Sequence, residues 1–166
     1  MTYMNIRNYI QLFFAIALSQ SAGLLGTIFT VDAVATWYPT LVKPALNPPA
    51  WVFGPVWTTL YILMGVASFI IWRIYETSSG AKKRFAGIAL MLFVLQLGLN
   101  AGWSVIFFGN QQLGWALFEV VCLWLAIVAT MYYFAKLSRT AAWLLVPYVL
   151  WVSFASYLNY SLWMLN

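Results

Sequence analysis

Five long apolar runs follow one another along the chain, and they constrain its fold more than any other feature. They cover about residues 9–29, 51–72, 86–108, 113–135 and 142–164, and each is close to the roughly 20 residues that a helix needs to cross a bilayer. The runs are continuous rather than alternating, which excludes a transmembrane barrel. Because a spanning segment must satisfy its own backbone hydrogen bonds, the sequence predicts an all-α integral membrane protein. We expect one domain over residues 1–166, with five transmembrane helices and a long ordered loop at 30–50.

The composition agrees with a membrane protein and narrows its chemistry. Hydrophobic residues make up 64% of the chain and charged residues 7%, where a soluble domain carries roughly 25% charged residues. There is no histidine, which removes the commonest metal ligand and the commonest general base. We therefore expect no metal site and no resident cofactor. The basic residues sit in the connections, which argues against nucleic-acid binding.

The basic residues also predict the orientation in the membrane. Seven of the eight fall in the N-terminal segment and in the second and fourth connections: Arg7, Arg73, Lys82, Lys83, Arg84, Lys136 and Arg139. Lys43 alone lies in the first connection. By the positive-inside rule, the N-terminus faces the cytoplasm and the first loop faces outward, if the membrane is a bacterial plasma membrane.

The first loop differs from the other connections in its residues. Its part from Trp37 to Pro49 reads WYPTLVKPALNPP, so four prolines stiffen a segment that also carries aromatic residues. Loops of this length in compact proteins are usually functional or disordered, and disorder does not suit so many aromatic side chains. We therefore expect a functional role for this segment.

Helical phasing at 100° per residue gathers polar and aromatic residues on one face of three helices. They are Gly54, Trp57, Tyr61, Gly65 and Ser68 on the second helix, Gln96, Asn100, Trp103 and Phe107 on the third, and Tyr148, Trp151, Ala155 and Asn159 on the fifth. An amide in a membrane helix is costly unless it faces a cavity or a neighbouring helix, so the Asn100 face should look inward. A hydrogen bond between helices, with no ligand, would also explain it.

Three glycines lie on the opposite face of the third helix: Gly87, Gly98 and Gly102. The spacing of Gly98 and Gly102 permits the close approach of another helix, within the bundle or from a second subunit. A five-helix bundle has little room for inward amides and inward glycines on the same helix. We therefore expect a homodimer through this face.

Glu119 is the only ionisable residue within the five apolar runs. A carboxyl group at such a position is a candidate functional group. It also lies about two turns from the predicted start of its helix, where it could pair or cap near the interface. Both roles stay open at this point.

The ten tryptophans divide by depth. Some, including Trp37 and Trp51, lie near predicted helix ends, where tryptophan forms interfacial belts in any membrane protein. Trp57, Trp103 and Trp151 lie deeper and on the inward faces. With Tyr61 and Phe107 these indoles could line a pocket for a flat, largely apolar ligand. Ordinary packing is the competing explanation.

Spaced groups of residues along nearly the whole chain resemble the signature of one membrane family. They are Trp37-Tyr38, Lys43-Pro44, Asn47-Pro48-Pro49, Trp51-Val52-Phe53-Gly54, Val56 to Tyr61, Leu99-Asn100-x-x-Trp103, Ile106 to Gly109, Gln112-x-Gly114 to Leu117, Pro147-Tyr148-x-x-Trp151-x-x-Phe154-Ala155 and Leu158-Asn159-Tyr160-x-x-Trp163. Their order and spacing resemble those of the translocator proteins. These are also called tryptophan-rich sensory proteins or peripheral benzodiazepine receptors.

The resemblance implies a five-helix bundle, usually dimeric, with a ligand cavity under the first loop. Family members bind porphyrins such as protoporphyrin IX, and synthetic isoquinoline carboxamide and benzodiazepine ligands; animal members also bind cholesterol. Carried onto this chain, the pocket residues are Trp57, Asn100, Trp103, Trp151 and Ala155, with Trp37, Pro48 and Trp51 in or near the lid. Trp57 and Trp151 match tryptophans proposed to act in light-dependent porphyrin degradation, so they are candidate catalytic residues. The inward faces add Tyr61, Phe107 and Tyr148 as candidate ligand contacts.

Two departures from the family pattern matter. The animal sterol motif closes with a basic residue after the positions of Leu158 and Tyr160, whereas Ser161 to Asn166 contain none. Sterol recognition by that route is therefore not expected. In addition, Glu119 stands where animal members carry an aspartate. The negative charge is kept, and the side chain that carries it is longer by one methylene group.

Three functions compete at this point: a porphyrin receptor or sensor, an enzyme that degrades protoporphyrin under light, and a transporter of porphyrin or another small hydrophobic solute. Transport is the weakest, because the sequence has no internal repeat and one charge within its apolar runs. Without histidine, imidazole cannot ligate haem iron, so a metal-free porphyrin stacked on the indoles is the expected ligand. Its propionates would meet Lys43 or amides of the lid.

Overall fold

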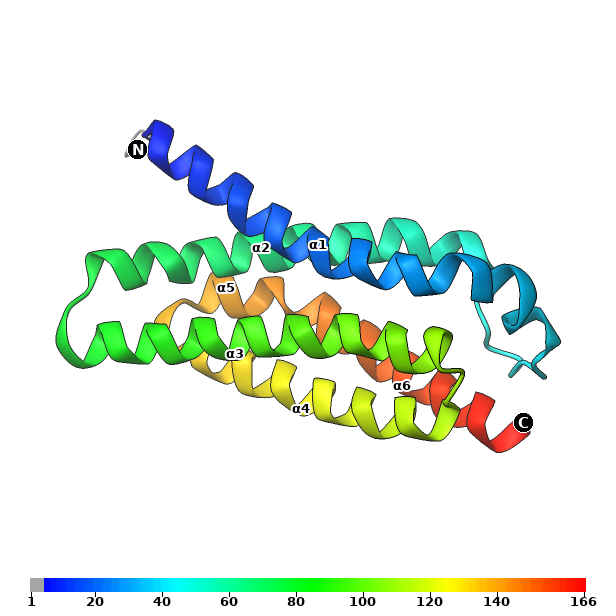
Figure 1. The fold of residues 1–166 in the computed structure, drawn as a ribbon. Coiled ribbons are helices and arrows are strands. Elements are labelled where there is room, and N and C mark those ends of the chain that lie inside the picture. The colour runs from blue at the N-terminus through cyan, green and yellow to red at the C-terminus, as the bar shows by residue number, and fades with distance from the viewer. Residues whose placement is uncertain (1–4) are drawn as a thin grey trace.

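The computed structural model describes residues 5–166, and helices make up all the regular structure in that range (Figure 1). The elements are α1 (Ile6–Thr36), the short 3-10 helices η1 (Tyr38–Thr40) and η2 (Ala50–Val52), α2 (Phe53–Thr77), α3 (Gly80–Ser104), the π-helical segment η3 (Val105–Gly109), α4 (Leu113–Leu137), α5 (Arg139–Leu144) and α6 (Val146–Leu165). Five segments are long and apolar enough to cross a membrane, with η2 counted with α2, η3 with α3, and α5 with α6. The prediction of an all-α membrane protein with five spanning segments is confirmed.

The first helix is longer than its apolar run, and the loop after it is shorter than the predicted 30–50. α1 continues to Thr36, because the hydroxyls of Thr30 and Thr36 donate to carbonyls one turn back, at 2.8 and 2.7 Å, without breaking the helix. It ends three residues before Pro39, which has no amide hydrogen to continue it. We call the remaining connection, residues 37–52, the lid.

The second connection is also shorter than its apolar boundaries predicted. α2 continues to Thr77 and α3 begins at Gly80, whereas the runs end at about 72 and begin again at about 86. Hydropathy marks only the part of a helix inside the hydrocarbon, and polar ends project beyond it. Gly80 has a φ of +57°, a backbone conformation that suits glycine, so the chain turns sharply there.

The fifth span is interrupted, where the sequence predicted one helix over 142–164. α5 begins behind Ser138, whose Oγ accepts a hydrogen bond from the Ala141 amide at 3.3 Å. α6 begins anew at Val146, because Pro147 has no amide hydrogen to extend the hydrogen-bond ladder of α5. The break lies near one end of the span and leaves α6 regular beyond it.

The helices enclose a dense core in the half of the bundle away from the lid. Met64 and Ile71 of α2, Phe93 of α3 and Phe134 of α4 are each at most 1% exposed. The Phe93 and Phe134 rings stack with centroids 6.1 Å apart. We call the region around these four side chains the packed half, and the lid with the space beneath it the lid half.

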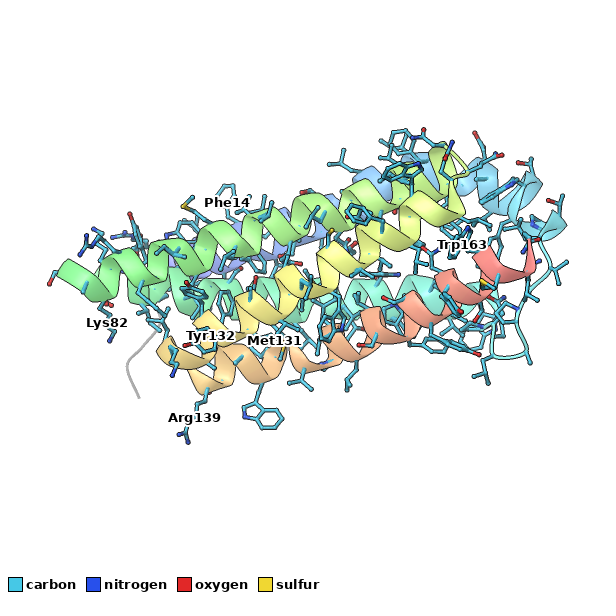
Figure 2. All side chains as sticks on the ribbon, turned by 90° about the horizontal axis from the view of Figure 1, so that it is seen from below. Phe14, Lys82, Met131, Tyr132, Arg139 and Trp163 are labelled. Atoms are coloured by element: carbon cyan, nitrogen blue, oxygen red, sulfur yellow. The ribbon has the colours of Figure 1, made fainter. Side chains whose placement is uncertain are left out.

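The two ends of the bundle differ in charge. Figure 2 shows Lys82 and Arg139 near one end and Trp163 toward the other. At the basic end, Arg7 Nη2 pairs with Glu76 Oε1 at 2.6 Å. This contact joins the start of α1 to the end of α2, at the end of the bundle opposite the lid.

Candidate functional site

A cavity of about 870 Å³ lies beneath the lid. Its volume falls in the range of about 300–1,000 Å³ that is typical of small-molecule sites. Eight of the eleven predicted site residues line it: Pro48, Trp57, Tyr61, Asn100, Trp103, Phe107, Trp151 and Ala155. The inward faces predicted for the second, third and fifth helices therefore meet in one space.

The other three predicted residues, Trp37, Trp51 and Tyr148, do not line the cavity. The Trp37 ring packs edge-on against the Phe107 ring, with centroids 5.7 Å apart, and so holds the lid against η3. Trp51 is 76% exposed, as expected of an interfacial tryptophan. Tyr148 is 1% exposed and lies behind the wall. Helical phasing gives the direction of a side chain, but not whether a neighbour covers it.

A chain of hydrogen bonds forms a polar floor beneath the cavity. Tyr61 Oη donates to Asn100 Oδ1, Asn100 Nδ2 donates to Tyr148 Oη at 3.1 Å, and Tyr148 Oη donates to Gln96 Oε1 at 2.9 Å. All four side chains are at most 5% exposed. Asn100 therefore bonds between helices and also lines the cavity. An amide nitrogen carries two hydrogens, and Asn100 Nδ2 makes one hydrogen bond among the described residues.

Two stacked aromatic pairs build the walls. Trp57 stacks on Tyr61 with ring centroids 5.4 Å apart, and Trp103 stacks on Phe107 at 4.6 Å. The π-helical segment η3 begins just after Trp103, and such segments are frequent at functional sites. Trp103 Nε1 donates to Asn159 Oδ1 at 3.1 Å, which fixes the orientation of its indole.

Trp151 contributes a buried donor that is not used within the protein. Its Nε1 has no hydrogen-bond partner among the described residues, and its ring packs edge-on against Phe53 at 5.8 Å. An unpaired buried donor costs about 1–3 kcal/mol. The ring lines the cavity, but the indole N–H itself is buried and unpaired.

The lid is held by contacts within it and to the end of α6. Tyr38 Oη donates to Asn47 Oδ1 at 2.7 Å. Asn166 Oδ1 accepts from the Val42 amide at 2.9 Å, and Asn166 Nδ2 donates to the Val42 carbonyl at 3.1 Å. Burial raises the pKa of Tyr38 above its usual value, and the hydrogen bond to Asn47 opposes this rise. The Tyr38 phenol is therefore neutral at physiological pH.

Lys43 supplies the charge at the edge of the cavity. Its Nζ donates to the carbonyls of Pro39 and Leu41 at 3.3 and 3.4 Å, and it lies 5.1 Å from the centroid of the Tyr38 ring. Among residues 5–166, it is the one charged side chain that lines the cavity. The site is therefore apolar and aromatic, with a single cation at its lid side.

The α1 wall of the cavity was missed by the sequence reasoning. Gln20, Gly23, Thr27 and Thr30 line the cavity. A signal was present, because these small and polar residues recur on one face of an otherwise apolar helix. The hydroxyls of Thr27 and Thr30 donate to backbone carbonyls one turn back, at 2.9 and 2.8 Å, so this wall also suits an apolar ligand.

Glu119 is buried behind the walls and does not line the cavity. It is 8% exposed, and neither carboxyl oxygen has a hydrogen-bond partner in the described part of the chain. The pairing or capping role considered for it therefore has no contact to support it.

Glu119 is not the only charged residue on the long helices. Because the helices extend beyond their apolar runs, Asp32, Arg73 and Glu76 are helical as well. Over residues 5–166, no three His, Cys, Asp or Glu side chains gather to hold a metal ion.

Gly98 and Gly102 leave an open strip on α3. A Cβ placed on either glycine would meet no atom within 4 Å. No described helix of this chain therefore packs closely on the two glycines, which excludes the first of the two uses considered for them. Contact with a second subunit stays a prediction.

Comparison with known proteins agrees with the site and the fold. Residues 15–164 match the model of the TspO/MBR family. The chain is 47% identical over 151 residues to the tryptophan-rich protein TspO of Chlorobaculum tepidum, covering 91% of this chain and 92% of that one. It is 39% identical over 144 residues to the translocator protein of Bos taurus (87% and 83% covered), and 38% identical over 130 residues to the tryptophan-rich sensory protein of Cereibacter sphaeroides (78% and 77% covered). The resemblance noted in the sequence is confirmed: this chain is an integral membrane protein that belongs to the TspO/MBR family.

Proposed function

We propose that this protein is a membrane receptor or sensor that binds porphyrins, such as protoporphyrin IX, in the cavity under its lid. The observation that carries the proposal is the convergence of Trp57, Trp103 and Trp151 from three helices on one cavity that has a single cation at its edge. Aromatic rings bind flat aromatic ligands by stacking and edge contacts. The relatives named tryptophan-rich sensory protein and translocator protein support a receptor role.

Lys43 orients the ligand in this proposal. A porphyrin with two propionates is apolar over most of its surface and anionic at one edge. That edge would point to Lys43 on the lid side, and the apolar rings would lie between the indoles. The second amide hydrogen of Asn100 would donate to an acceptor on the ligand, and the Trp151 ring would contact the ligand by its face or edge. Isoquinoline carboxamides and benzodiazepines, which combine flat rings with a carbonyl acceptor, fit the same arrangement.

A fluorescence titration tests the binding. Protoporphyrin IX added to the protein in lipid nanodiscs should quench tryptophan fluorescence saturably. Trp151→Phe replaces the indole that lines the cavity with a smaller ring, and it should weaken binding by up to about tenfold, in line with about 0.5–1.5 kcal/mol for an aromatic contact. The matched control is Trp143→Phe, because Trp143 is 71% exposed and does not line the cavity. Linear, unsaturable quenching that is equal in all three proteins would refute the proposal.

Light-dependent degradation of protoporphyrin is a second candidate function, favoured by the fact that Trp57 and Trp151 both line the cavity. The step would be oxidative, with dissolved dioxygen as the oxidant and the two indoles as redox-active groups. Illuminated and dark samples with protoporphyrin IX, with and without dioxygen, separate binding from degradation. Loss of porphyrin absorbance that needs light and dioxygen and fails in Trp57→Phe and Trp151→Phe supports the enzyme. Bleaching equal to that in protein-free controls excludes it.

Transport of a solute through the bundle is less favoured. The cavity ends at the polar floor, and beyond it Met64, Ile71, Phe93 and Phe134 fill the packed half with side chains that are at most 1% exposed. A solute would have to displace this core to cross. The same packing suits a receptor, which needs a closed site rather than a path.

The orientation and the assembly complete the proposal. Seven basic residues at one end of the bundle favour that end as the cytoplasmic one in a bacterial plasma membrane, with the lid outside.

The open strip at Gly98 and Gly102 favours a homodimer through α3. Cross-linking of Gly98→Cys in membranes tests the dimer, with Leu25→Cys on α1 as the control position; both variants would be made in a Cys122→Ser background.

A further inference from the structure

We propose that the protein has a second binding site, a groove on its outer surface that takes one anionic phospholipid from the leaflet at the basic end. The groove lies between α4, α5 and α6 and has a volume of about 580 Å³. It shares no lining residue with the cavity under the lid. The inference therefore does not depend on porphyrin binding.

Short side chains keep the groove open. Ala135 of α4 and Ala142 of α5 line it with one methyl group each, and Val128 of α4 and Val149 of α6 line it further from the basic end. None of these side chains is long enough to fill the space between the helices. From Trp124 to Ala135 the α4 wall is about 16 Å long at a helical rise of about 1.5 Å per residue. This length suits an extended acyl chain.

The part of the groove away from the basic end is apolar. Val128, Met131 and Val149 carry no hydrogen-bonding group in their hydrocarbon portions that a polar ligand could use, and the Trp124 indole donates to Ser153 Oγ at 2.9 Å. An acyl chain that enters leaves one hydrocarbon environment for another, so it gains packing contacts rather than a hydrophobic driving force. The headgroup should therefore decide which lipid is preferred.

The mouth of the groove at the basic end carries a cation and two exposed aromatic rings. Arg139 lines the groove and is exposed, and Figure 2 shows it extending away from the helices at that end. Trp143 and Tyr132 also line it and are 71% and 58% exposed. Lys136 Nζ lies 5.3 Å from the centroid of the Tyr132 ring, which places a second cation beside the mouth. Exposed Trp and Tyr mark the level of lipid headgroups.

The two cations at the mouth have no anionic partner in the described part of the chain. Both ion pairs found within residues 5–166 use Glu76, which contacts Arg7 and Arg73. A lipid phosphate would supply the missing negative charge to Arg139 and Lys136. Guanidinium groups bind phosphate through paired hydrogen bonds, and basic pockets between helices at a membrane surface attract anionic headgroups.

A second copy of the chain is the competing occupant, and charge disfavours it. A twofold interface brings the same surface of both copies together. Arg139 and Lys136 of one copy would then approach those of the other with no carboxylate between them, and like charges at an interface repel. The open strip proposed for the dimer, at Gly98 and Gly102, lies on α3, which does not line the groove.

Lipid binding to the full chain in detergent tests the role of the charge. Native mass spectrometry would compare phosphatidylglycerol with phosphatidylcholine of the same acyl chains. The unmodified protein should prefer phosphatidylglycerol, and Arg139→Gln should lower that preference by about fivefold, the effect of one basic residue near an anionic lipid. Arg84→Gln is the matched control, because Arg84 is exposed at the same end and does not line the groove. An equal preference in Arg139→Gln and the unmodified protein would overturn the proposal.

A filled groove tests the place of binding. Ala135→Phe puts a ring in the groove and keeps Arg139, so it should weaken the binding of both lipids. Leu125→Phe is the control on the same helix, because Leu125 is 57% exposed and does not line the groove. Undiminished lipid binding in Ala135→Phe would overturn the proposal. Glycerol phosphate that binds as tightly as phosphatidylglycerol would also overturn it, because the headgroup alone would then explain the binding.

The oligomeric state of the same variant separates a lipid from a second copy. Ala135→Phe should leave the mass of the protein assembly unchanged. Loss of a dimer in this variant, with lipid binding intact, would overturn the proposal in favour of a protein interface. Porphyrin affinity should be the same in Arg139→Gln, Ala135→Phe and the unmodified protein, so failure of the porphyrin site would leave these results standing.

Discussion

The lid half and the packed half share the same helices but differ in what the helices enclose. In α2, Trp57 and Tyr61 border a cavity, and Met64, one turn further, is fully buried. In α3 the order is reversed, with Phe93 in the core and Trp103 in the cavity wall. One half therefore leaves space between its helices, and the other fills it.

The difference teaches how a small bundle combines rigidity with a binding site. Dense packing in one half stabilises the helices, so the other half can keep a large cavity and unpaired polar groups. Substitutions in the packed half should therefore change stability without changing affinity, and substitutions in the lid half should change affinity. The following variants test that separation, from the largest expected effect to the smallest.

Phe134→Ala should give the largest effect. The ring is 0% exposed and stacks on Phe93, and removal of a buried aromatic ring costs about 3–5 kcal/mol. Thermal unfolding in detergent should show this loss, while the folded fraction should bind protoporphyrin IX with unchanged affinity. Tyr132→Ala is the control on the same helix, because Tyr132 is 58% exposed. Equal destabilisation by both variants would contradict a dense core.

Asn100→Ala lies at the boundary of the two halves and should affect both properties. It leaves the Tyr61 hydroxyl without its acceptor and the Tyr148 hydroxyl without one donor, and unpaired buried groups cost about 1–3 kcal/mol each. We expect a lower unfolding temperature together with weaker porphyrin binding. Gln96→Ala removes the far end of the same chain and should lower stability alone. If Asn100→Ala changed neither property, the polar floor would not have the role assigned to it.

Lys43→Ala should have a small effect that is confined to affinity. Partly exposed ion pairs contribute about 0.2–1 kcal/mol, so protoporphyrin IX should bind about two- to fivefold more weakly. The difference from the unmodified protein should shrink as salt rises. Lys43→Arg should keep the affinity, and the uncharged dimethyl ester of protoporphyrin should not distinguish the variants. An unchanged affinity and salt dependence in Lys43→Ala would exclude its pairing with propionates.

Arg7→Ala should have the smallest effect of the four. The pair with Glu76 lies at the basic end, and the Arg7 side chain is 65% exposed. Such pairs are worth at most about 1 kcal/mol, so the unfolding temperature should fall slightly. Porphyrin affinity should not change, because the pair lies at the end of the bundle opposite the lid. A marked loss of binding would show that the two halves are coupled.

The sequence predicted the spanning segments and part of the cavity wall on α2, α3 and α6, because hydropathy and phasing depend on residues near one another in the chain. Apolar length identified the five helices, and the 100° period brought Trp57, Asn100 and Trp151 to inward faces. Helix ends were less accurate, since α1 continues to Thr36 through polar residues that satisfy their own hydrogen bonds. The sequence also could not show whether neighbouring residues cover a side chain. The Tyr148 side chain points inward as predicted, but its neighbours separate it from the cavity.

Filling the cavity tests the central claim most directly. Ala155 lines the cavity, and Ala155→Phe would place a ring where the porphyrin should lie. Ala135→Phe, at an exposed position of α4 that does not line the cavity, is the matched control. In an equilibrium titration with protoporphyrin IX, we expect Ala155→Phe to abolish saturable quenching and Ala135→Phe to leave it unchanged. Saturable quenching of equal affinity in both variants would contradict the claim that the space beneath the lid is the binding site.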